Sequence, residues 1–305
     1  MILNGIINVH KEAGYTSHDV VARLRGILRQ KKIGHTGTLD PDAVGVLPVC
    51  LGRATKACSF LEQDDKTYQA GLLLGLTTDT EDISGQVLDR GIVTVTEEEI
   101  REIIMSFLGS YDQIPPMYSA KKIGGKKLYE LARQGLTVER KPSRVVIKDI
   151  SIQEVCLPRV HFTVTCSKGT YIRSLCRDIG EKAGCGACME SLVRTRVGRF
   201  SLDQARTLSE IETLRDQGKL ERIILPVDQV FEDRPRGTAL KEAEKLLYNG
   251  NPLPMHLCHF PDGDFPVDEE KSQVRIYDQA GFFIGIYKVQ ATENYLKPLK
   301  IFYTS

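Results

Sequence analysis

The chain has 305 residues, of which 41% are hydrophobic and 27% are charged, and its formal net charge is +1. This length suits one large domain with a small second one, and the near-neutral charge excludes a protein that grips a polyanion over its whole surface. There is no apolar run of about 18 residues and no signal-peptide pattern. We therefore expect no transmembrane helix, and a cytoplasmic protein whose eight cysteines are reduced thiols.

The N-terminal part is predicted to alternate strands and helices around a glycine-rich loop. A short buried strand is expected at Gly5–Val9. Thr16 and Asp19 form a capping-box pattern, and the apolar residues that follow have helical spacing, which predicts a helix. The next expected elements are the loop 34–42, a strand at Gly45–Leu51 and a helix at Arg53–Gln63.

The middle of the chain shows a reversal of charge. The segment 119–148 has nine basic residues against two acidic ones, whereas 76–104 has eight acidic residues against two basic ones. A local basic stretch on a near-neutral chain favours one polyanion-binding face, although a solvated loop has the same composition. The elements expected here are strands at Lys66–Gly75 and Gln86–Leu88, a helix opened by Thr96 and Glu99 and ended by Gly109, a helix at Lys126–Gln134, strands at Val145–Val155 and Val160–Cys166, and a helix at Thr170–Ala183.

The C-terminal part is predicted to be a small unit of its own. The segment 226–238 is charged and contains proline and glycine, which predicts a linker. A helix at Ala239–Tyr248 and several short strands ending at Ile301–Tyr303 should follow. We therefore expect two domains, 1–235 and 236–305.

Asp40 lies in the glycine-rich loop and directly precedes a proline. Taken alone, such an aspartate is more often a helix N-cap than a catalytic residue, because proline suits the first helical position. Asp42 could form a metal site with Asp40, and Cys185 with Cys188 could form half a zinc site. The aspartates have no further ligand cluster, and the cysteines would depend on the distant His256, Cys258 or His259 instead of a second close pair, so we expect no metal.

Five segments, in this order along the chain, resemble motifs of the TruB family of bacterial tRNA pseudouridine synthases. The segments are 11–21, 34–56, 66–70, 116–122 and 167–175. The tail from residue 236 resembles the small RNA-binding PUA domain. The resemblance implies an α+β fold, in which a catalytic domain on a mainly antiparallel mixed sheet carries an RNA-binding insertion around 76–150 and is followed by a PUA-like β domain.

The resemblance also implies roles for single residues. Asp40 matches the essential aspartate, and Arg173 matches the arginine that pairs with it, which should keep Asp40 ionised. Tyr68 matches a tyrosine that stacks on the target base and could act as a base, although by pattern alone it would be a core residue. The residues matched to the uracil pocket and to the space around the flipped-out nucleotide are His35, Tyr171 and Leu192.

The activity implied is the isomerisation of uridine to pseudouridine at position 55 in the T-loop of tRNA. Breaking a C–N bond and forming a C–C bond oxidises nothing, so no cofactor is expected. Asp40 could add to the sugar or the base, or take a proton from the sugar. The target base must be flipped out of the RNA. Phosphate contacts are expected from Lys121, Lys122, Lys126, Lys127 and Arg144.

The partner expected is the T-arm stem-loop of tRNA, bound by a monomer that needs no protein partner and no membrane. Two rival hypotheses remain open. In the first, the chain is an RNA-binding or RNA-folding protein whose ancestral site is idle. In the second, it performs the same chemistry on another RNA, as guide-RNA-dependent relatives do.

Overall fold

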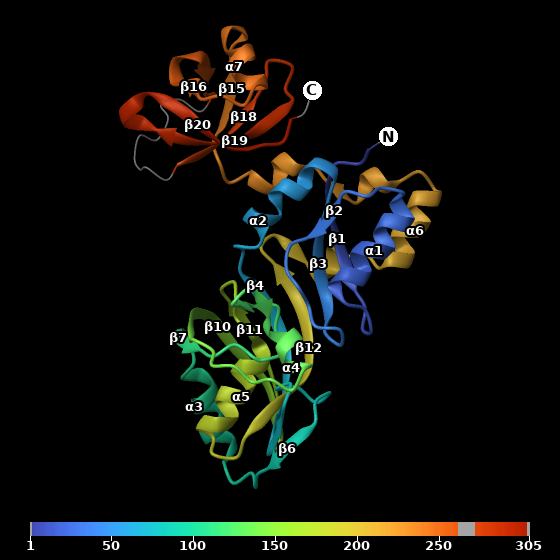
Figure 1. Ribbon diagram of the computed structural model, residues 1–305, viewed down its shortest axis with the longest axis vertical. Helices are drawn as coiled ribbons and strands as arrows, with labels where there is room; N and C mark the ends of the chain where they lie inside the picture. The colour runs from blue at the N-terminus through green and yellow to red at the C-terminus, as the bar shows by residue number, and fades with distance from the viewer. Residues whose placement is uncertain (1, 262–271, 304–305) are drawn as a thin grey trace.

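The computed structural model describes residues 2–261 and 272–303. Figure 1 shows an elongated molecule with a large mixed body and a small β unit that contains the C-terminus at one end. Residues 262–271 and 304–305 of the predicted unit 236–305 lie outside the described residues. None of the helices within the described ranges is long and apolar enough to cross a membrane.

A ten-stranded sheet runs through the large body. Eight of its strands lie side by side in the order β14-β1-β3-β12-β4-β11-β10-β7, while β2 pairs with β3 and β13 with β12. Only the β3–β12 pair is parallel, which confirms the predicted mainly antiparallel sheet. The strands are β1 (Gly5–Lys11), β2 (Ile33–His35), β3 (Val44–Leu51), β4 (Lys66–Leu74), β7 (Gly109–Gln113), β10 (Ser143–Cys156), β11 (Arg159–Cys166), β12 (Ala187–Val197), β13 (Phe200–Ser201) and β14 (Ile224–Leu225).

Helices pack on the large sheet and contribute to two hydrophobic cores. Both predicted capping boxes form, because the side chains of Thr16 and Thr96 each accept the backbone N–H three residues on. The helix opened by Thr96 ends at Met105, and Gly109 instead begins β7. The helices are α1 (Ser17–Leu28), α2 (Cys58–Leu61), α3 (Glu97–Met105), α4 (Leu128–Ala132), α5 (Ile172–Lys182), α6 (Leu208–Asp216) and α7 (Glu244–Tyr248).

Strand β12 joins the two halves of the sheet, and sequence reasoning missed it. It pairs with β4 along nearly its whole length and with β3 through Val193–Val44 and Arg194–Gly45. Gly45 has a φ of +112°, and a Cβ there would lie 2.2 Å from the carbonyl oxygen of Arg194. Only glycine therefore allows β3 to approach β12 this closely.

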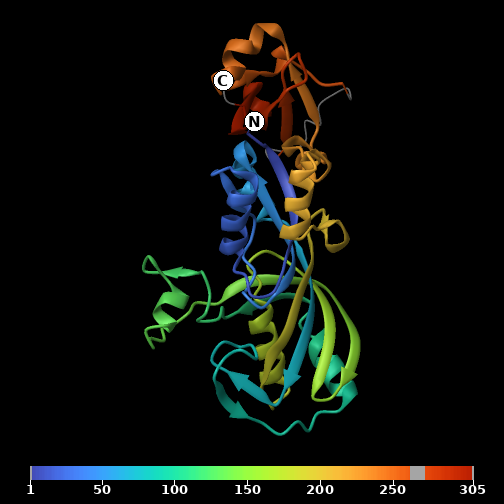
Figure 2. The same ribbon diagram turned by 90° about the vertical axis from the view of Figure 1, so that its right-hand side faces the viewer.

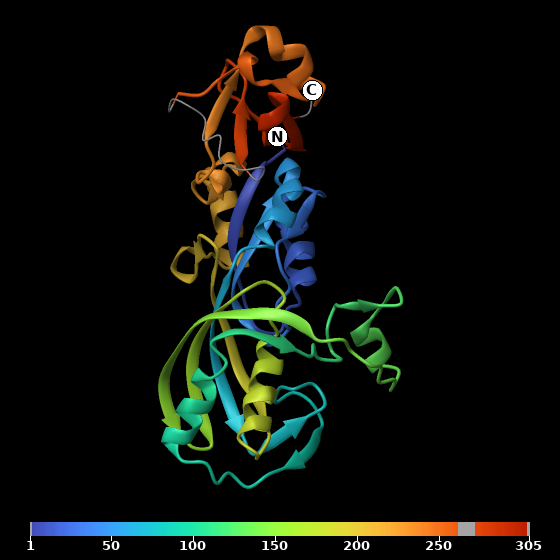
Figure 3. The ribbon, with the colours of Figure 1, turned by 90° about the vertical axis from the view of Figure 1, so that its left-hand side faces the viewer.

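An arm formed by residues 116–142 projects from the large body, as Figures 2 and 3 show. It holds a two-stranded ribbon of β8 (Lys122–Ile123) and β9 (Lys126–Lys127), followed by α4. Met117, Leu128 and Leu131 form a small core of its own. The predicted helix Lys126–Gln134 is thus shorter than expected, because its first two residues pair as a strand.

The C-terminal unit is a six-stranded sheet in the order β16-β20-β19-β18-β15-β17. The segment 226–238, predicted to be a linker, joins the large sheet to the C-terminal sheet, and it contains a 3-10 helix (Val227–Phe231) that packs through one aromatic residue. Phe231 is fully buried, and its ring lies 5.3 Å from that of Phe60 and 5.9 Å from that of Phe302. The strands are β15 (Arg236–Ala239), β16 (Leu253–Pro254), β17 (Cys258–His259), β18 (Gln273–Tyr277), β19 (Phe283–Gln290) and β20 (Tyr295–Ile301).

Candidate active site

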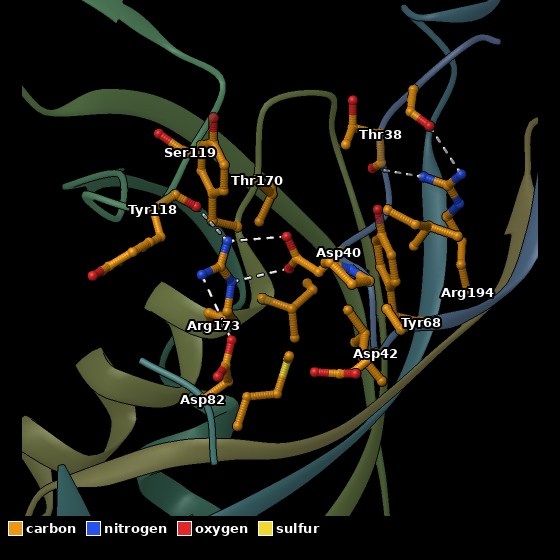
Figure 4. Close-up of a pocket in the computed structure, with 18 of the residues that line it drawn as sticks. Thr38, Asp40, Asp42, Tyr68, Asp82, Tyr118, Ser119, Thr170, Arg173 and Arg194 are labelled. Carbon is orange, nitrogen blue, oxygen red and sulfur yellow. Dashed lines mark hydrogen bonds and ion pairs between the residues drawn. The ribbon is translucent and has the colours of Figure 1, made fainter. Parts of the chain in front are cut away.

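A cavity of about 620 Å³ opens where the glycine-rich loop, β4, β12 and the start of α5 meet. Figure 4 shows that side chains from these distant parts of the sequence point into the same space. Of the six residues predicted for catalysis and base binding, five line the cavity: Asp40, Tyr68, Tyr171, Arg173 and Leu192. The adjacency of β3, β12 and β4 explains this convergence, because it places the loop before β3 beside Tyr68 on β4.

Asp40 and Arg173 form a two-point ion pair inside this cavity. Nε of Arg173 lies 3.0 Å from Oδ2 of Asp40, and Nη2 lies 3.1 Å from Oδ1. The arginine side chain is only 6% exposed, whereas 36% of the aspartate side chain remains accessible. A bidentate pair fixes the plane of the carboxylate as well as its position. Asp40 is therefore held in one orientation while it still faces the cavity.

Arg173 is held in turn by three further groups. Its Nη1 donates to the carbonyl oxygen of Thr80 at 2.9 Å, and its Nη2 donates to that of Tyr118 at 2.8 Å. The carboxylate of Asp82 lies 3.7 Å from Nη1. Sequence reasoning missed Asp82, because within the acidic segment 76–104 nothing distinguishes it from its neighbours. The only sequence feature that could have pointed to Asp82 is its position in a polar turn between two predicted strands.

Burial in the cavity raises the pKa of Asp40 above the ordinary value of a carboxyl group. Arg173 opposes this shift, and the negative charge of Asp82 adds to it. Arg173 thus favours the ionised form of Asp40, as expected, but desolvation outweighs the ion pair and the net shift of the pKa is upward. Asp40 and Asp82 both lie against the guanidinium of Arg173, so the negative charge of Asp82 partly offsets the attraction between Arg173 and Asp40.

Arg194 is a second buried arginine of the site, and sequence reasoning did not single it out. It is 1% exposed and lies opposite Tyr68 in the β12–β4 ladder. Its guanidinium donates to three backbone carbonyl oxygens, at 2.7 Å to Val46, 3.2 Å to Gly37 and 3.4 Å to Thr38. It thereby fastens the loop that carries Asp40 to the sheet. The sequence feature that could have revealed Arg194 is a charged residue at a strand position whose side chain points into the protein.

Lys11 holds the other side of the same loop. Its side chain is completely buried, and its Nζ donates to the carbonyl oxygens of Pro41 at 2.8 Å, Ala43 at 2.5 Å and Glu12 at 3.1 Å. Burial lowers the pKa of Lys11 to about 8, so the ammonium group still carries its charge at neutral pH. The loop around Asp40 is thus fixed by cations at both ends.

Glu81 fixes the turn that presents Thr80 and Asp82 to Arg173. It is a non-glycine residue with a φ of +63°, a conformation that costs free energy and persists only when surrounding contacts impose it. Its buried carboxylate accepts a hydrogen bond of 2.6 Å from Oγ of Ser174 and forms an ion pair with Arg177. Both partners belong to α5, the helix that also carries Arg173. Glu81 therefore ties the turn to the same helix.

Tyr68, Tyr171 and Leu192 form the aromatic and apolar part of the wall. Tyr68 and Leu192 are each 8% exposed. Burial raises the pKa of the phenol groups of Tyr68 and Tyr171. The backbone of Tyr171 exchanges two hydrogen bonds with the side chain of Gln113. His35 lies beside the cavity, where its Nδ1 accepts the N–H of Gly37 at 3.3 Å. Its proposed contact with a nucleotide stays a prediction.

The five residues predicted to contact phosphates lie on or next to the arm. Lys122 and Lys126 are exposed on its ribbon. Three others already have partners: Lys121 donates to Ser143, Lys127 donates to Tyr129, and Arg144 pairs with Asp112 at 3.4 Å. The Arg144–Asp112 pair is exposed on both sides and contributes little free energy, so an incoming phosphate can replace it.

The two pairs considered as metal sites acquire no further ligands. Within residues 2–261 and 272–303, no group of three or more His, Cys, Asp or Glu side chains is arranged to hold a metal ion. Cys185 and Cys188 are buried thiols, and burial raises the pKa of Cys188 to about 11.

Two family models together match most of the chain. Residues 25–172 match the N-terminal domain of the TruB family pseudouridylate synthases, and residues 173–232 match the C-terminal domain of tRNA pseudouridylate synthase B. A Lachnoclostridium phytofermentans protein named tRNA pseudouridine synthase B is 51% identical over 98% of this chain and 100% of its own length. The Bacillus subtilis protein of the same name is 39% identical over 98% of each chain.

Solved structures show the same architecture. A chain of a Cbf5–Nop10–Gar1 complex is 27% identical, with a TM-score of 0.73, over 98% of this chain and 85% of that one. A chain of an H/ACA ribonucleoprotein bound to a substrate RNA containing 2′-deoxyuridine is 26% identical, with a TM-score of 0.72 and the same coverage. The chain is thus similar, along nearly its whole length, to proteins that share this arrangement of sheet and C-terminal unit.

Proposed function

This chain belongs to the TruB family of pseudouridylate synthases, and we propose that it converts uridine 55 in the T-loop of tRNA to pseudouridine, with Asp40 as the catalytic carboxylate. The observation that carries this proposal is the ion pair of Asp40 with Arg173 inside the cavity. The chain is 39–51% identical over 98% of its length to two relatives named tRNA pseudouridine synthase B. These identities favour tRNA over the RNA of the more distant complexes.

The cavity suits a single flipped-out nucleotide. Its volume of about 620 Å³ falls within the range of pockets that enclose small ligands. A uridine within folded RNA is inaccessible, so the enzyme takes the base out of the stack at a cost of a few kcal/mol. Aromatic and apolar wall residues replace the lost stacking, and we assign this role to Tyr68, Tyr171 and Leu192.

The reaction needs an ionised carboxylate beside the glycosidic bond. Whether Asp40 adds to the sugar or the base, or takes a proton from the sugar, only its charged form can act. Arg173 favours that form and fixes its orientation. The raised pKa of Tyr68 keeps its phenol protonated at neutral pH, which supports a stacking role over a role as a base.

RNA binding outside the cavity is assigned to the arm and to the C-terminal unit. The arm carries Lys122 and Lys126 on its exposed ribbon, within an insertion that we place at 76–150. We assign residues 1–235 to the catalytic domain and 236–305 to a PUA-like RNA-binding domain. We further propose that the protein acts in the cytoplasm as a monomer that needs no guide RNA, protein partner, metal or cofactor.

The direct test is to incubate the purified protein with unmodified tRNA and to map new pseudouridine along the RNA. The proposal predicts a single modified position, uridine 55, without any added cofactor. Binding without modification would favour an RNA-binding protein with an idle site. Modification that appears only with another RNA would favour the guide-dependent or alternative-substrate hypothesis.

A further inference from the structure

Three segments that are distant in the sequence carry seven basic residues and no acidic one. The segments are 29–34, 52–57 and 295–301. Their basic residues are Arg29, Lys31, Lys32, Arg53, Lys56, Lys297 and Lys300. This concentration is unusual for a chain whose net charge is only +1. Segments of like charge create a strong local potential only where they lie close together in space, and these three segments do.

Two hydrogen bonds bring the three segments together at the junction between the large body and the C-terminal unit. The backbone N–H of Gly52 donates to the carbonyl oxygen of Lys32 at 2.8 Å, which places Lys32 beside Arg53. One turn further along the 3-10 helix Gly52–Ala57, Nζ of Lys56 donates to the carbonyl oxygen of Ile301 at 2.7 Å. That bond places Lys56 next to Lys300. We call Lys32, Arg53, Lys56 and Lys300 the junction cluster.

Within residues 2–261 and 272–303, the junction cluster has no acidic partner. None of its four residues forms an ion pair with an acidic residue in the described part of the chain. Burial and the positive charges of the other three cations lower the pKa of Lys56. Like charges held together repel each other, and an anion that binds among them relieves the repulsion. The cluster is therefore arranged to receive negative charge from outside.

The composition of the cluster suits phosphates rather than bases. Segments 29–34 and 52–57 contain no aromatic residue that could stack on a base, and the only one in 295–301 is Tyr295, five residues before Lys300. Lysine and arginine side chains contact the phosphate backbone, which fixes position without reading sequence. In Figures 2 and 3, the light-blue region that contains residues 52–61 lies on the side of the long axis from which the arm projects. One RNA molecule can therefore contact the arm, the cavity and this junction.

We propose that the junction cluster binds backbone phosphates of a helical part of the tRNA that lies beyond the T-arm stem-loop. This proposal rests on the proposed function, because it assumes that a tRNA stem-loop occupies the cavity. The cluster then adds affinity for the full-length substrate without taking part in the chemistry. It also makes that affinity more sensitive to salt, because each phosphate contact releases condensed counterions.

The test is the full-length triple variant Lys32→Gln, Arg53→Gln, Lys300→Gln. Lys56 is kept, because its bond to Ile301 joins the two parts of the molecule. The Kd for unmodified full-length tRNA should rise about tenfold near 0.1 M salt, and the slope of log K against log salt should flatten by about two to three. The Kd for an isolated T-arm stem-loop, and the rate on saturating stem-loop, should not change.

A matched control removes the same charge elsewhere. Arg159→Gln, Lys182→Gln, Arg222→Gln replaces three exposed cations that lie outside the cluster and outside the regions assigned to RNA binding, and should leave tRNA affinity within about twofold. Unchanged tRNA affinity in the junction variant would overturn the proposal, and so would an equal loss in the control or an equal loss on the stem-loop. Failure of the proposed function would be seen separately, as absence of pseudouridine when the unaltered protein acts on either RNA.

Discussion

Arg173 contacts both carboxylate oxygens of Asp40, with Nε 3.0 Å from Oδ2 and Nη2 3.1 Å from Oδ1. The same guanidinium donates to the carbonyl oxygens of Thr80 and Tyr118. A single arginine therefore joins the catalytic loop, the turn after β5 (Leu76–Thr78) and the base of the arm. Only a planar group with several fixed donors makes all these contacts at once.

Arg173→Lys should therefore lower the rate of isomerisation on bound RNA about 100-fold, because a point charge does not fix the plane of the carboxylate. The affinity for tRNA should change little, since the arm and the exposed lysines are intact. Single-turnover kinetics at saturating enzyme measure the rate separately from binding. Activity close to that of the unaltered protein would show that the orientation of Asp40 does not depend on the bidentate pair.

The pH dependence should report the raised pKa of Asp40. The reaction requires the carboxylate, so activity is present above the pKa of Asp40 and is lost as the pH falls through it. Because burial and Asp82 raise that pKa, the midpoint should lie above the ordinary value of about 3.9. Asp82→Asn removes one of the two causes and should move the midpoint to lower pH. A midpoint that stays in place or rises in this variant would contradict the assignment.

Glu81 should act as a positioning residue. Glu81→Ala removes the partner of Ser174 and Arg177, so the turn with Thr80 and Asp82 loses its attachment to α5. We expect kcat to fall about tenfold with little change in KM, because a small misplacement of the site residues slows the reaction without removing a contact that binds the RNA. Glu181→Ala is the matched control, because this exposed carboxylate pairs with the same Arg177 at 3.6 Å. Equal effects of the two substitutions would refute the role of Glu81.

Lys11→Met should destabilise the fold as well as the loop. Methionine fills a similar volume but leaves the buried carbonyl oxygen of Ala43 without a donor, whereas that of Pro41 still accepts the backbone N–H of Gly14 at 3.1 Å. The unpaired carbonyl of Ala43 should cost about 1–3 kcal/mol in the free energy of unfolding. Urea unfolding of the two proteins measures this difference. A variant as stable as the original would mean that the loop reorganises without these bonds.

Much of the fold could be predicted from local patterns in the sequence. Capping boxes at Thr16 and Thr96 and alternating strands such as β11 follow from rules that act within a few residues. Strand β12 was missed because arginine and glutamate residues interrupt its apolar pattern. The burial of Phe231 within the predicted linker 226–238 could not be foreseen, because it depends on contacts with residues far away in the chain.

The candidate site shows the same difference between features with a local sequence pattern and features that depend on long-range contacts. Motif resemblance pointed to Asp40, Tyr68 and Arg173, which do meet in one cavity. The supporting residues Arg194, Lys11 and Glu81 act through backbone carbonyls and buried carboxylates, and the sequence does not show which partners these side chains meet. The sign of the pKa shift of Asp40 also depends on burial, which only the three-dimensional arrangement reveals.

The central claim is that the Asp40 carboxylate carries out the chemistry. Asp40→Asn keeps the size of the side chain and removes its charge, so it separates catalysis from binding. The decisive measurement is the rate of pseudouridine formation by this variant under single-turnover conditions, together with its Kd for unmodified tRNA. We predict no detectable pseudouridine, with a Kd within about tenfold of the original, which corresponds to about 1.4 kcal/mol. Substantial pseudouridine formation by Asp40→Asn would contradict the account.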